Sequence, residues 1–84
     1  MPLAARMMAI ADIFEALTAS DRPYKKAKTL SEAVRIMHRM QEEGHIDPDL
    51  FRLFLIRGIH LEYGRRFLQP GQLDTVDIAQ YTLR

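Results

Sequence analysis

The chain has 84 residues, with 12 Lys and Arg against 11 Asp and Glu, a net charge of +1 and no cysteine. Its length allows one domain with a modest core. The balanced charge argues against a general nucleic-acid binder, and the lack of cysteine excludes disulfides and thiolate metal sites. No apolar run is long enough for a bilayer, and the opening residues lack the features of a signal peptide. We therefore expect a cytoplasmic protein that binds neither nucleic acid nor membrane.

Hydrophobic periodicity predicts an all-α fold, a small bundle of about four helices. The first helix is predicted from about Pro2 to Thr18, because proline is well suited to an opening helical turn. It should end near Asp21, since the residue before Pro23 is disfavoured in the helical conformation. Its core-facing stripe follows the i, i+4, i+7 spacing of one helical face: Leu3, Met7, Ile10, Phe14 and Leu17.

A second helix is predicted to begin after Thr29, because Glu32 three residues later completes the pattern of a capping box. This helix should run to about Glu43, and Gly44 suits the left-handed conformation that ends a helix. Its buried stripe is expected to be Leu30, Ala33, Val34, Met37 and Met40.

The start of a third helix is predicted at Asp47 and Pro48, the first as the cap and the second in the first helical position. This capping role explains both residues fully, although His45 nearby makes a metal site tempting. Ile46 is expected to pack against Phe51 as a hydrophobic staple. The apolar face of this helix comprises Leu50, Phe51, Phe54 and Leu55.

A fourth helix is predicted over residues 59–68, after a break at Gly58. It is weaker than the others, because Gly64 within it costs roughly 1 kcal/mol relative to alanine. The Pro-Gly pair at 70–71 should break the chain. Residues 1–70 are thus expected to form one helical subdomain, and residues 71–84 a tail that holds a short helix or is partly disordered.

The first helix contains a carboxylate in unusual surroundings. At about 100° per residue, Asp12 lies opposite the core-facing stripe. The rest of its face is small or apolar: Ala5, Met8, Ala9, Ala16 and Ala19. A helix that is apolar nearly all round is usually buried, and a buried carboxylate is costly unless it is paired or bound to a metal. The pattern alone leaves two alternatives open, a metal ligand and a surface aspartate on an alanine-rich helix.

Two other groups of residues are possible sites. The histidines, His38, His45 and His60, are scattered rather than at helical spacing from Asp12, and we expect His38 and His60 at the surface. A basic stretch uninterrupted by acids could hold a phosphate or form an ordinary solvated loop: Arg22, Lys25, Lys26 and Lys28.

The sequence AIADIFEALT at 9–18, followed by DRPYKKA at 21–27, resembles the segment AIADxFDALTxxRPYKxA of HD-GYP domains. LSEA at 30–33 and GHIDPDL at 44–50 resemble that family's next helix and its GTxFDPxL segment. The resemblance covers residues 3–55. HD-GYP domains are bacterial all-α signalling domains of the HD phosphohydrolase superfamily, and their active members hydrolyse cyclic di-GMP. The chain is similar to the C-terminal part of such a domain.

By this resemblance, Asp12 matches the family's last metal-ligating aspartate. The implied site holds two or three divalent or iron ions, which activate water for attack on phosphorus. Arg22 and Lys25 match positions that contact the phosphates of the cyclic dinucleotide, a role that suits the donor fork of arginine and the mobile charge of lysine. Glu15 stands where the family has aspartate and is expected to be structural. No catalytic residue is assigned in this chain alone.

Two departures from the family pattern matter. The spacing from Asp12 to Arg22 is one residue longer than the commonest pattern, which leaves the placement of Arg22 and Lys25 open. The His-Asp pair and the GYP segment are absent from these residues and would precede them. We therefore expect a phosphohydrolase fragment that is inactive and metal-free by itself. Asp12 in open water, far from any groove that other helices could occupy, would count against this interpretation.

The alternative is a degenerate, non-catalytic helical module that mediates association. Under either interpretation the first helix has two apolar sides, and an exposed apolar face is a liability unless another chain covers it. The sequence therefore predicts a homo-oligomer that forms through the first helix.

Overall fold

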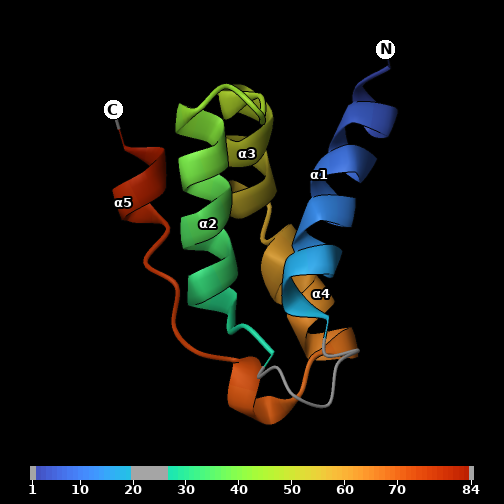
Figure 1. The fold of residues 1–84 in the computed structure, drawn as a ribbon, viewed down its shortest axis with the longest axis vertical. Helices are drawn as coiled ribbons and strands as arrows, with labels where there is room; N and C mark the ends of the chain where they lie inside the picture. The colour runs from blue at the N-terminus through green and yellow to red at the C-terminus, as the bar shows by residue number, and fades with distance from the viewer. Residues whose placement is uncertain (1, 20–26, 84) are drawn as a thin grey trace.

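The computed structural model describes residues 2–19 and 27–83, and within these ranges all regular structure is helical (Figure 1). The all-α prediction is confirmed. In chain order the elements are α1 (Leu3–Thr18), α2 (Leu30–Glu42), α3 (Pro48–Ile56), α4 (Ile59–Phe67), the 3-10 helix η1 (Pro70–Gln72) and α5 (Ala79–Thr82).

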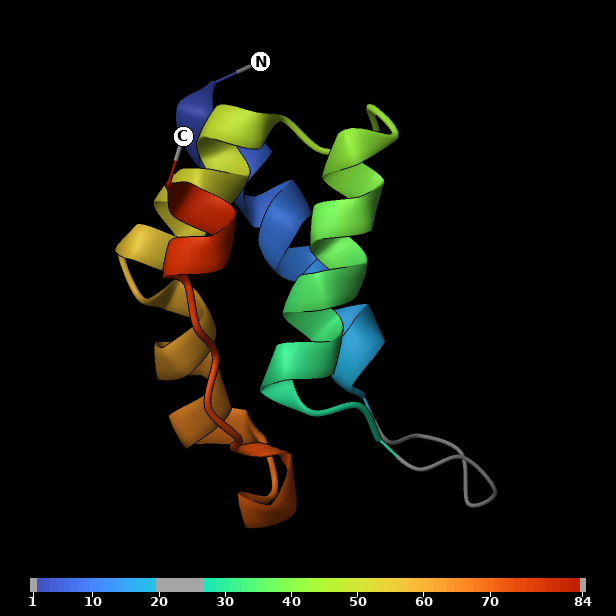
Figure 2. The same cartoon turned by 90° about the vertical axis from the view of Figure 1, so that its left-hand side faces the viewer.

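Helix α3 lies at the centre of the bundle and contacts α1, α2, α4 and α5. Helix α1 packs against α2 and α3, and in Figure 1 it forms one edge of the molecule, with no other labelled helix beyond it. Helix α5 forms the opposite edge. The chain reaches it through a segment that leaves η1 at the far end of the bundle and runs back past α2, as Figure 2 shows from the side.

The core brings α1, α3 and α4 together through aromatic side chains. The ring of Phe14 meets those of Phe54 and Tyr63 edge-on, with centroids 5.5 and 5.4 Å apart. Such pairs contribute about 0.5–1.5 kcal/mol beyond the area that they bury. The buried hydrophobic side chains form one cluster: Ile10, Phe14, Leu30, Ala33, Val34, Met37, Ile46, Leu50, Phe51, Phe54 and Leu55.

The predicted caps of α2 and α3 are confirmed. Thr29 and Glu32 form the capping box, in which the Thr29 N–H donates to Glu32 Oε1 at 2.9 Å and the Glu32 N–H donates to Thr29 Oγ1 at 3.3 Å. Asp47 Oδ1 accepts from the N–H groups of Asp49 and Leu50 at 2.8 and 3.2 Å. These local contacts fix where α2 and α3 begin.

The glycines at two helix ends have left-handed backbones, as predicted for Gly44. Gly44 follows α2 with φ of 84°, and Gly58 separates α3 from α4 with φ of 68°. Both values lie in the left-handed region, which glycine adopts without the steric cost that a Cβ would bring.

One packing prediction was wrong, because Leu3 is 59% exposed. Gly64 lies within α4 and has a packing role that the sequence did not predict. A Cβ there would lie 3.0 Å from Leu73 Cδ2 and 3.3 Å from Leu30 Cδ2, so the glycine permits close approach of α4 to its neighbours.

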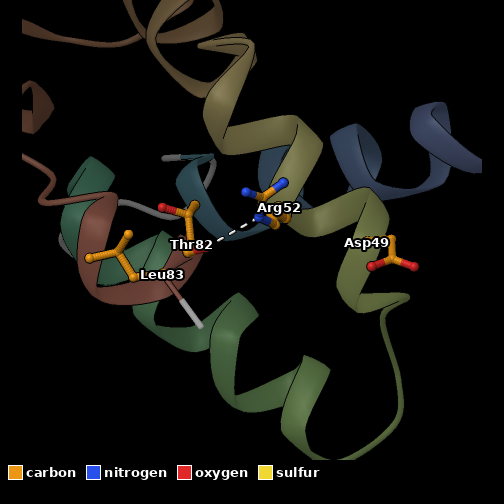
Figure 3. Close-up of a pocket in the computed structure, with 4 residues that line it drawn as sticks. All are labelled: Asp49, Arg52, Thr82 and Leu83. Atoms are coloured by element: carbon orange, nitrogen blue, oxygen red, sulfur yellow. Dashed lines mark hydrogen bonds between the residues drawn. The ribbon is translucent and has the colours of Figure 1, made fainter.

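The end of α5, in the C-terminal segment, is attached to α3 by a hydrogen bond. Arg52 Nε donates to the carbonyl oxygen of Thr82 at 3.2 Å, beside a hollow of ≈320 Å³ that Asp49 and Leu83 also line (Figure 3). Among the described residues, no helix combines the length and apolar character needed to cross a membrane.

His60 was predicted at the surface, and this prediction was wrong: its side chain is 1% exposed. Neither ring nitrogen has a hydrogen-bond partner among the described residues. Burial lowers the pKa of His60, and an interaction with the backbone of Phe54 opposes this shift only in part. The imidazole is therefore mostly neutral in the folded protein at neutral pH.

This burial predicts a loss of stability in mild acid. Below pH of about 6.5 the unfolded chain takes up a proton on His60 that the folded chain excludes, so the free energy of unfolding should fall by up to about 1.4 kcal/mol per pH unit until the folded-state pKa is reached. Urea unfolding at several pH values between 7.5 and 5 measures this slope. His60→Leu should flatten it; an unchanged slope in that variant would show that other groups cause it.

Candidate functional site

Asp12 lies on the side of α1 that faces away from the core, opposite the buried Ile10 and Phe14. Its side chain is exposed, and no hydrogen bond or ion pair joins its carboxylate to another described residue. The neighbours on its face are exposed as well, with Met8 at 65%. They are Ala5, Met8, Ala9, Ala16 and Ala19.

The spacing on this face is that of a helix-packing surface. Alternating steps of four and three residues connect Ala5, Ala9, Asp12, Ala16 and Ala19. This is the heptad spacing along which one helix meets another, and small side chains let the two backbones approach closely. We call these five residues together with Met8 the outer face of α1. Asp12 stands at its middle.

The described residues do not form a metal centre by themselves. Within residues 2–19 and 27–83, no group of three or more His, Asp or Glu side chains could hold an ion. His60 is buried beside Phe54, with ring centroids 6.0 Å apart, and His38 packs against Tyr81 at 5.1 Å. Because a metal site needs several ligands, Asp12 can supply only one of them.

The expected phosphate contacts, Arg22 and Lys25, lie outside the described residues. One side chain, Gln72 of η1, donates to the carbonyl oxygens of both Thr18 and Lys28, at 3.0 and 2.9 Å. This contact was not predicted, because a single glutamine in a tail has no local pattern.

Asp47 has a structural role, as predicted from its position. Hydrogen bonds from the N–H groups of Leu50 and Asp49, together with the nearby Arg6, lower the pKa of Asp47 despite some burial. The guanidinium of Arg6 also forms an ion pair with Asp47, which links α1 to the start of α3. Capping and this ion pair account for its carboxylate.

An apolar groove lies beside the N-terminal half of α1, between this helix and the corner that joins α3 to α4. Its volume is ≈510 Å³. A smaller hollow of ≈150 Å³ lies between α1 and the start of α3, where Ala9 and Ile13 line it together with His45. Asp12 lines neither of these two hollows and its carboxylate is in open water, which counts against the metal-ligand interpretation unless other helices cover the outer face of α1. The groove is lined by Leu3, Ala4, Met7, Leu53, Arg57 and Ile59.

Comparison of the sequence with known proteins identifies the family of this chain. Residues 1–50 match the HD domain family, which covers more than half of the chain. The chain is also 52% identical, over 76 residues, to the cyclic di-GMP phosphodiesterase PA4108 of Pseudomonas aeruginosa. That match covers 88% of this chain but 17% of the relative, so the chain spans about a sixth of the relative's length. No solved structure matches. The chain belongs to the HD domain family.

Proposed function

We propose that the chain is the C-terminal part of a metal-dependent phosphohydrolase domain of the HD-GYP kind, acting on cyclic di-GMP, and that it is inactive in isolation. The observation that carries this proposal is the position of Asp12, a carboxylate at the middle of an exposed helix-packing face. Membership of the HD domain family and the 52% identity to a cyclic di-GMP phosphodiesterase support it.

The outer face of α1 gives the physical reason for a metal at Asp12. Any helix that packs on the alanines of this face takes the carboxylate out of water. Burial of an ionised carboxylate is expensive unless a cation compensates it. A divalent metal supplies that compensation, and it also lowers the pKa of a bound water so that a nucleophile is available near neutral pH. Asp12 would be one ligand, and the helices that cover the outer face would bring the others.

The same reasoning explains why the chain should be inactive alone. The described residues contain no cluster that could complete a metal site around Asp12. Arg22 and Lys25 are proposed as phosphate contacts on the family pattern. They could bind the dinucleotide but could not activate water. A metal ion and the remaining ligands are therefore required from the intact domain.

A chimera tests the proposal. In the Pseudomonas aeruginosa relative, the matching segment is replaced by this chain, and cyclic di-GMP hydrolysis and bound metal are measured. We expect a folded chimera that binds metal and hydrolyses cyclic di-GMP. Asp12→Asn should lower the rate by about 100-fold or more and reduce the bound metal, because a ligand is lost.

Glu15→Gln is the matched control, because it removes a carboxylate charge from the same helix one turn away and should leave metal content and hydrolysis largely unchanged. The isolated chain, assayed in parallel, should neither retain metal nor hydrolyse the dinucleotide. A folded chimera in which Asp12→Asn keeps its metal and its activity would refute the role of Asp12.

A second candidate function, a helical module for association, is favoured by the exposed apolar surface of α1. Met8, on the outer face of this helix, is 65% exposed. Apolar surface of this kind gains free energy when another chain covers it, at about 25 cal/mol per Å². We propose that a second copy covers the outer face when the rest of the domain does not.

Light scattering on the isolated chain measures this association. We expect twice the mass of a single chain, and Met8→Glu should shift the molecule to monomer, because it places a charge in the interface. Leu83→Glu is the control: Leu83 is 79% exposed but follows α5, at the opposite edge of the bundle. A stable monomer at high concentration in the unmodified chain would contradict the association.

A further inference from the structure

Two aromatic side chains of α4 form an exposed shelf. Tyr63 and Phe67 are four residues apart and therefore lie on the same side of the helix. Their ring centroids are 4.9 Å apart, with an interplanar angle of 46°. Phe67 is 65% exposed, whereas the other phenylalanines, Phe14, Phe51 and Phe54, are at most 1% exposed. We call Tyr63 and Phe67 together the aromatic shelf.

The aromatic shelf is attached to α1 beside the outer face. The ring of Phe14 meets that of Tyr63 edge-on, with centroids 5.4 Å apart. Burial, and then the neighbouring carboxylate of Glu15, raises the pKa of Tyr63, so the hydroxyl keeps its proton at neutral pH. Glu15 follows Asp12 by about one turn, which places it about 60° around α1 at about 100° per residue. The aromatic shelf therefore flanks the outer face on its Glu15 side.

Charged side chains border the aromatic shelf on α4. Glu62 Oε1 and Arg66 Nε are 3.5 Å apart, and both side chains are exposed. These residues directly precede Tyr63 and Phe67, respectively. A helix broad enough to cover the shelf would also take this ion pair out of water, which costs free energy. A planar ligand could cover the exposed ring of Phe67 without burying the charges.

A guanine base of the proposed substrate fits these requirements. Each base of cyclic di-GMP is joined to the phosphodiester through a ribose, so a phosphate at Asp12 leaves the bases to the sides of the outer face. Bases stack on aromatic side chains, because every base has a flat π-face. The open ring of Phe67 offers such a surface on one of these sides.

We infer that the aromatic shelf is a stacking site for one guanine base of the dinucleotide, with Phe67 as the ring that meets the base. This inference rests on the proposed function. Phe14 holds Tyr63 and Tyr63 supports Phe67, so the shelf exists before the ligand arrives and loses little side-chain freedom on binding. Phe67 meets the base and not the phosphorus. Its loss should therefore weaken substrate binding and leave the chemical step nearly intact.

The kinetic test compares three substitutions of Phe67 in the chimera, and each variant should fold because this side chain is exposed. Phe67→Ala should raise KM for cyclic di-GMP about tenfold and keep kcat within about twofold, because a stacked base is lost from the ground and transition states alike. Phe67→Trp should keep the KM, since an indole also stacks. Phe67→Leu keeps most of the apolar volume but has no π-face, so it should behave like Phe67→Ala. Leu83→Ala, at the opposite edge of the bundle, is the control and should change neither constant.

Two kinetic results would overturn the inference. An unchanged KM in Phe67→Ala would show that the ring does not meet the substrate. A normal KM in Phe67→Leu beside a raised one in Phe67→Ala would show that apolar cover by another helix, and not stacking on a base, accounts for the exposed ring.

A second arm does not depend on activity. NMR spectra of the isolated chain are recorded with GMP and with ribose 5-phosphate, which keeps the sugar and the phosphate but has no base. GMP at about 50 mM should shift the ring protons of Phe67 and Tyr63 upfield, because a single stacked base binds only at millimolar concentrations or above. Ribose 5-phosphate should not. No shift with GMP, or an equal shift with ribose 5-phosphate, would overturn the inference. A shift with GMP beside a folded, metal-loaded chimera that fails to hydrolyse cyclic di-GMP would sink the proposed function and leave the stacking site established.

Discussion

The packing of Phe14 against Phe54 and Tyr63 determines which side of α1 faces the core. Once these rings interlock, the opposite side of the helix must face away from α2, α3 and α4. That side is the outer face, with Asp12 at its middle. The exposure of this carboxylate is thus a consequence of the aromatic core, and so is the exposure of the small residues around it.

The outer face of α1 is a surface that a second helix could cover. Its alanines, at heptad spacing, make little packing contact while they are exposed to water, but they let a second helix pack closely. The carboxylate among them would oppose such packing unless a cation accompanies it. The proposed phosphohydrolase and the proposed dimer are two ways to cover the same surface, and the metal distinguishes them, because only the first supplies a cation to Asp12. A dimer would leave the carboxylate without that compensation, so it should be the weaker of the two associations.

The sequence predicted the features that depend on neighbouring residues. The caps at Thr29 and Asp47 and the left-handed Gly44 are local, and all were found. Features that depend on distant segments were not predicted. His60 is buried by packing against α3, and Leu30 and Leu73 approach Gly64 from other elements. Gln72 was missed for the same reason: its partners lie 44 and 54 positions away. Asp12 was placed correctly opposite the core-facing stripe, but the pattern left open whether its carboxylate is buried or exposed, and no local pattern reveals the ligands that would join it.

Carboxylate labelling with a carbodiimide, read by mass spectrometry, tests most directly whether Asp12 binds a cation beneath helices that cover the outer face of α1. In the isolated chain at low concentration Asp12 should react readily, as its exposure implies. In the metal-loaded chimera it should be protected, and a chelator should restore at least part of the reactivity, while Glu62 on α4 should react alike in every sample. Equal labelling of Asp12 in the isolated chain and in the metal-loaded chimera would contradict its role as a ligand.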